Sequence, residues 1–94
     1  MAGPAKPPVP LKVRDEIAGG VYANNMMVSH TREEFVLDFV YLAPTQAVLN
    51  ARVISSPGHL KRIIKALSEN LRRYEDQYGA IQEGTPPKKD KTVN

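Results

Sequence analysis

Apolar residues recur every three or four positions between Ser56 and Gly79, the longest regular pattern in the chain. This spacing winds apolar side chains into one stripe along an α-helix. Ser56 can accept a hydrogen bond from an unpaired amide at the helix start, Pro57 suits the first helical position, and Gly79 favours a left-handed stop. The sequence therefore predicts one helix here, with a stripe of Leu60, Ile63, Ile64, Leu67, Leu71, Tyr74 and Tyr78.

Most of this stripe also has the spacing of a coiled coil. Six of its residues fit a and d positions of a heptad: Leu60, Ile64, Leu67, Leu71, Tyr74 and Tyr78. Three heptads are a short run for a coiled coil, so packing on a sheet is the favoured interpretation and a helix–helix seam is the alternative. On the other side of the helix, Lys65 and Arg72 each lie four residues before an acid, which is typical of a solvated surface with a few ion pairs.

Before the helix, apolar and polar residues alternate with the period of a β-strand. The alternation predicts strands at Val21–His30, Glu34–Leu42 and Gln46–Ser55. Asn24 and Asn25 are poor strand residues, and we favour a bulge or an edge over a binding position as their explanation. Leu11–Val13 alternates briefly and suggests a further edge strand, followed by one helical turn at Asp15–Ala18.

The second predicted strand is apolar on both faces. One face holds Phe35, Leu37, Phe39 and Tyr41, which should form the core. The other holds Val36, Val40 and Leu42 together with Asp38. One helix can shield only one face, and the folded region is too short to supply another layer, so a second copy of the chain is expected to cover the other. Val36, Val40 and Leu42 are therefore the candidate self-association residues.

Composition sets the limits of the folded region. The chain has 94 residues and no cysteine, and four of its first ten residues are proline. We expect a single α+β domain at 11–81 between a disordered proline-rich arm at 1–10 and a disordered basic tail at 82–94. The sequence contains no apolar run long enough to span a bilayer and no apolar signal-peptide core, which predicts a cytoplasmic protein without a membrane partner.

Charge adds a second candidate surface. The formal net charge is +3, and the predicted helix alone has five basic and three acidic side chains. This mild excess makes nucleic-acid binding the alternative rather than the leading function. The candidate partner or anion-binding surface consists of His59, Lys61, Arg62, Lys65, Arg72 and Arg73. Arg52 interrupts the third strand, and a structural ion pair with Asp38 is favoured over an anion site there.

The sequence offers little for catalysis. His30 and His59 are its only histidines, and neither has a convincing partner for general acid–base work. The chain lacks a thiol nucleophile, a glycine-rich phosphate loop and a zincin-type histidine pair. We therefore expect no enzyme activity, no cofactor and no metal site.

A set of residues, with their spacing, is similar to the pattern of a known protein family. They are Tyr22, Asn24, His30, Glu34, Phe35, Leu37, Asp38, Phe39, Arg52, Ser56, Pro57, His59, Lys61, Arg62, Asn70, Tyr74 and Gly79. Over roughly Ile17–Ile81 the chain resembles the small bacterial family known as domain of unknown function 3467. The resemblance implies a cytosolic bacterial protein and brings no known activity.

The expected fold is α+β, an antiparallel sheet of three or four strands followed by one long C-terminal helix on its face, in the order (β)βββα. A homodimer or higher homo-oligomer that acts as a protein-interaction or assembly module is the favoured function. A nucleic-acid-binding protein that uses the basic helix face and the lysine tail is the alternative.

Overall fold

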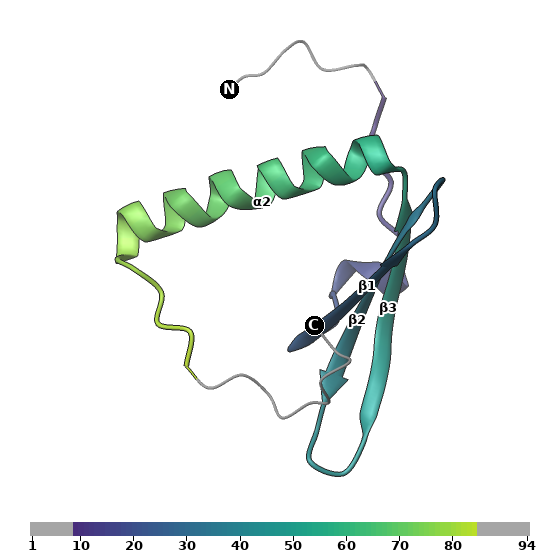
Figure 1. Cartoon of the computed structure of the whole chain (residues 1–94), viewed down its shortest axis with the longest axis horizontal. Coiled ribbons are helices and arrows are strands. Elements are labelled where there is room, and N and C mark those ends of the chain that lie inside the picture. The colour runs from purple at the N-terminus through teal and green to yellow at the C-terminus, as the bar shows by residue number, and fades with distance from the viewer. Residues whose placement is uncertain (1–8, 85–94) are drawn as a thin grey trace.

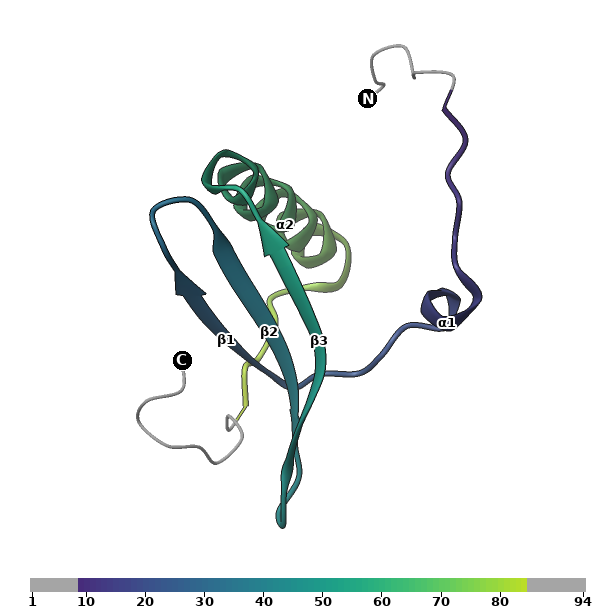
Figure 2. The same cartoon turned by 90° about the vertical axis from the view of Figure 1, so that its right-hand side faces the viewer.

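Three strands and one long helix make up most of the protein. The computed structural model describes residues 9–84, in which α1 (Asp15–Ala18) precedes β1 (Asn25–His30), β2 (Phe35–Leu42), β3 (Ala47–Ser55) and α2 (Pro57–Tyr78). The strands form one antiparallel sheet in the order β1-β2-β3, and α2 lies on one side of it (Figures 1 and 2). The predicted α+β arrangement of a sheet followed by a C-terminal helix is confirmed. Most of the predicted terminal arms lies outside the described residues.

The described part of the chain contains no fourth strand. The single turn predicted at Asp15–Ala18 is present as α1, but the strand predicted at Leu11–Val13 is not, and both apolar residues of that segment are exposed. After α1 the backbone turns at Gly20, which has a φ of 78°. The segment before α1 runs away from the sheet rather than along its edge (Figure 2), so an alternation this short did not suffice to form a paired strand.

Two asparagines hold the segment that enters β1. Asn24 Oδ1 accepts a hydrogen bond from the Leu42 N–H at 2.8 Å, and Asn24 Nδ2 donates to the Leu42 carbonyl at 3.1 Å. Asn50 is the extra residue of a bulge in β3, and its Nδ2 donates to the Tyr22 carbonyl at 2.7 Å. The side-chain amide of Asn24 thus takes the place of a backbone partner, which explains why β1 begins at Asn25 rather than at Val21.

The register assigns the strand residues to two faces. Leu37 pairs with Val28 and Val53, and Phe39 pairs with Met26, so these side chains share the face on which α2 lies. The other face has an ion pair near its centre. Arg52 Nε and Nη2 donate to Asp38 Oδ1 and Oδ2 at 2.7 and 2.9 Å, which confirms the predicted cross-strand pair.

Both ends of α2 form at the residues that the sequence indicated. Ser56 Oγ accepts a hydrogen bond from the His59 N–H at 3.1 Å, and Pro57 occupies the first helical position. At the other end the Gly79 N–H donates to the Glu75 carbonyl at 2.8 Å, and Gly79 has a φ of 95° and a ψ of 167°. This is an extended positive-φ conformation open essentially only to glycine, rather than the left-handed helical stop that was expected. Only Ser56 separates β3 from α2.

The helix covers the sheet over part of its length. Leu60 and Ile63 are half-buried against the sheet, whereas Leu67 and Tyr78 are 65% and 67% exposed. Figure 1 shows α2 continuing past the sheet after its first turns. Among the described residues, Leu37 and Val40 are the buried apolar side chains. The expected helix-on-sheet packing is therefore limited to the first half of α2.

Candidate self-association surface

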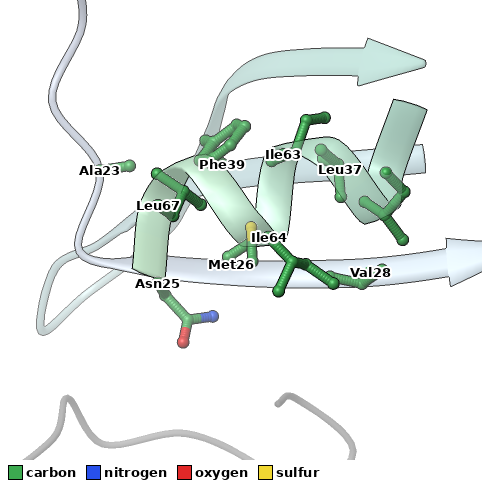
Figure 3. A pocket seen from close by; sticks show the side chains of 10 residues that line it. Ala23, Asn25, Met26, Val28, Leu37, Phe39, Ile63, Ile64 and Leu67 are labelled. Carbon is green, nitrogen blue, oxygen red and sulfur yellow. The ribbon is translucent and has the colours of Figure 1, made fainter. Parts of the chain in front are cut away.

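An apolar groove lies between the sheet and the first half of α2. Its volume is about 540 Å³, and we call it the sheet–helix groove (Figure 3). Its lining consists of Ala23, Asn25, Met26, Val28, Leu37, Phe39, Leu60, Ile63, Ile64 and Leu67. Asn25 is the one polar residue among these, and its side chain points away from the helix (Figure 3). The groove therefore presents little to a polar ligand and favours an apolar occupant.

Strand alternation places the sheet side chains of the groove on one face. On β2, Leu37 and Phe39 are two residues apart and so point to the same face, where Val28 and Met26 lie opposite them on β1. Met26 and Val28 are 39% and 38% exposed, and Ile64 on the helix side is 57% exposed. Side chains from both the sheet and α2 thus line the groove, and much of their apolar surface remains exposed in the single chain.

The apolar stripe of α2 continues beyond the groove. Leu71, Tyr74 and Tyr78 form what we call the distal stripe, and all three side chains are about half exposed or more. The rings of Tyr74 and Tyr78 lie 4.9 Å apart, centroid to centroid, at an interplanar angle of 48°. These two rings contact each other, and both side chains remain about half exposed or more. Among the described residues, the distal stripe is therefore a second apolar surface that stays largely open.

The predicted self-association residues lie on the opposite face of the sheet. Val40 is only 5% exposed, and Val36 and Leu42 are half-buried. Val40 is therefore already buried within one chain. The exposed apolar surface on this face belongs to the flanking strands, to Met27 and Ile54 among others.

The ion pair interrupts this opposite face. Hydrogen bonding from Arg52 holds the pKa of Asp38 below its usual value, against the opposing effect of partial burial. Asp38 is itself buried, while the Arg52 side chain is about half exposed. A second layer packed here would have to desolvate a charged pair, which is costly.

The predicted cationic surface lies on α2, away from the apolar stripe. At 100° per residue, Lys61, Arg62, Lys65, Arg72 and Arg73 fall within an arc of about 120° on the side opposite the stripe. All five are exposed. The ion pair between Arg52 and Asp38 is the one ion pair in residues 9–84, so the pairs expected for Lys65 and Arg72 do not form. His59 is exposed in the first turn and lies outside this arc.

Neither a metal cluster nor a membrane-spanning helix occurs in the described residues. His30 is exposed at the end of β1, and its ring lies 5.2 Å from that of Phe35. No group of three or more His, Asp or Glu side chains in residues 9–84 is placed to hold a metal ion. Within the same range, no helix combines the length and the apolar character needed to cross a membrane.

The family relationship follows from a comparison of the sequence with family models. The model of the family described as protein of unknown function DUF3467 matches residues 1–83. The chain belongs to the DUF3467 family. No curated protein and no solved structure matches this DUF3467 protein. The matched range includes the whole sheet and all of α2, so the resemblance noted over Ile17–Ile81 is confirmed.

The sheet–helix groove of this DUF3467 protein was not predicted from the sequence. Met26 and Val28 were placed on one face of a strand by alternation, but the pattern did not indicate that they would line an open groove. That groove exists because α2 diverges from the sheet. Apolar spacing continues without a break along all of α2, so the sequence contains no signal of where the helix would leave the sheet.

Proposed function

We propose that this DUF3467 protein is a self-associating protein-interaction module whose apolar surfaces are covered by a second copy. The supporting observation is the small extent of burial within one chain. In residues 9–84 only Leu37 and Val40 are buried apolar side chains, while both the groove and the distal stripe face solvent. Monomeric soluble proteins rarely leave contiguous apolar surface of this kind in water.

The size of the fold supports the same proposal. A folded region of about 70 residues buries a small share of its surface, and oligomerisation is one of the few ways to supplement such a core when disulfides and metals are absent. This chain has no cysteine. A second copy would add buried apolar area without any further sequence.

Sedimentation equilibrium of the full chain, from low to high micromolar concentration, tests the proposal. We expect a dimer or a higher oligomer, with circular dichroism confirming folded protein at each concentration. A well-folded monomer at high micromolar concentration would refute self-association.

The five cations of α2 support a second candidate function, nucleic-acid binding. Their exposure and their lack of ion pairs within the described residues leave them available to phosphates. Fluorescence anisotropy with random DNA and RNA is the test. If the cations bind phosphates, affinity should fall steeply between about 50 and 200 mM salt and weaken when Lys65 and Arg72 are replaced by alanine. Loss of binding only on deletion of residues 86–94 would assign it to the tail instead, and no binding at low salt would exclude it.

A further inference from the structure

We propose that two copies associate through an antiparallel, two-fold pair of α2 helices, in which the distal stripe of each copy fills the sheet–helix groove of the other. This inference rests on the self-association proposed above and specifies its surface. One apolar stripe of α2 contributes to both surfaces. Its N-terminal half lines the groove, and its C-terminal half is the distal stripe.

The spacing of the stripe is self-complementary. Its heptad positions are separated by four, three, four, three and four residues, which is the same order from either end. In an antiparallel pair centred near residue 69, each of these positions therefore meets another one. The pairs are Leu60 with Tyr78, Ile64 with Tyr74, and Leu67 with Leu71.

The shapes of the two halves also complement each other. The half beside the groove has aliphatic side chains, and the distal half has the two tyrosines. The groove, at about 540 Å³, is in the size range of about 300–1,000 Å³ that encloses drug-sized ligands, and two phenol rings are of that size. The tyrosine hydroxyls would remain at the open edge of the groove, where water can reach them.

The area available is close to what a stable dimer requires. Five stripe side chains, from Ile64 to Tyr78, are about half exposed or more in the single chain. If each contributes roughly 100 Å², the helix supplies about 500 Å² per copy, and the walls of the groove at Met26, Val28 and Phe39 add to this. A standard interface buries about 800 Å² per partner.

Charge favours this helix pair over packing of the opposite sheet faces. The five cations of α2 lie opposite the stripe, so they point outward when two stripes meet. Sheet-on-sheet packing would instead bury the ion pair of Asp38 and Arg52.

Cysteine cross-linking tests the arrangement directly, because the chain has no cysteine of its own. Ile64→Cys and Tyr74→Cys variants of the full chain are mixed in equal amounts and oxidised. Both side chains are about half exposed, so neither change should unfold the chain. In the proposed pair, position 64 of one copy faces position 74 of the other, whereas identical positions lie about 15 Å apart along the axis, beyond the reach of a disulfide. We expect the mixed disulfide to dominate.

Each other outcome overturns the arrangement. Disulfides between identical positions would show parallel helices. The absence of cross-links in a protein that still sediments as a dimer would place the interface elsewhere and leave self-association intact. A monomer at all concentrations would refute self-association as well.

Point variants provide an independent measurement. Tyr74→Glu should raise the Kd of the dimer by about 30-fold or more, as loss of a central aromatic residue does. Arg73→Ala is the matched control, since it changes the net charge by the same amount on the outward side and should leave the Kd unchanged. Ile54→Asp, on the opposite sheet face, should also have no effect. Dissociation by Ile54→Asp but not by Tyr74→Glu would refute the helix pair.

Discussion

Leu67→Ala should destabilise an isolated chain only slightly and a dimer much more. In the single chain Leu67 is 65% exposed, so about a third of its surface is buried. Full burial of a leucine side chain stabilises by about 1.5–3 kcal/mol, so truncation should cost the monomer about 0.5–1 kcal/mol. In the proposed dimer the remaining surface is also buried, and the alanine leaves a cavity. The cost there should reach about 2–3 kcal/mol per copy.

Urea unfolding followed by circular dichroism measures this difference. The titration is run at protein concentrations well below and well above the dimer Kd, because stability gained from association depends on concentration. Val40→Ala is the matched control. Val40 is 5% exposed within one chain and lies on the sheet face opposite the groove, so its truncation should cost about 1.5–3 kcal/mol at both concentrations. A cost for Leu67→Ala that is small and equal at both concentrations would show that Leu67 lies in no interface.

Three further changes test particular contacts. Ser56→Ala removes the acceptor of the His59 N–H and should lower the free energy of unfolding by about 1 kcal/mol in a urea titration. Asn24→Asp replaces the donor to the Leu42 carbonyl with an acceptor, so it should lower the melting temperature more than Asn24→Ala does. Equal melting temperatures of the two variants would contradict the donor role of the Asn24 side chain. The folded-state pKa of Asp38 is lowered, so its stabilising effect is present above the unfolded pKa of about 3.9 and is lost as pH falls through the folded pKa. The free energy of unfolding should thus fall below about pH 4, and less so for Asp38→Asn; an unchanged pH dependence in that variant would refute the assignment.

Local structure could largely be predicted from sequence, because short-range rules determine it. The helix ends at Ser56 and Gly79 and the Asp38–Arg52 pair depend on neighbours in the chain or directly across a strand. The position of the uncovered apolar surface depends on how far a helix travels over a sheet, which periodicity does not encode. Val40 was therefore expected to need a partner copy, although it is already buried within the single chain. The role of Asn24 was also beyond pattern analysis, since an amide that replaces a backbone partner has no distinctive spacing.

Because a single residue joins β3 to α2, a small change of angle at that residue moves the far end of the helix a long way. Ser55 is the last strand residue and Pro57 the first of the helix, so the backbone angles at Ser56 alone set the direction of a segment about 33 Å long. A rotation of about 10° at that point displaces the far end of the helix by about 6 Å, roughly one helical turn. The capping hydrogen bond and the proline restrict those angles. A substitution at this junction could thus change which surfaces meet in an assembly while leaving both the sheet and the helix intact.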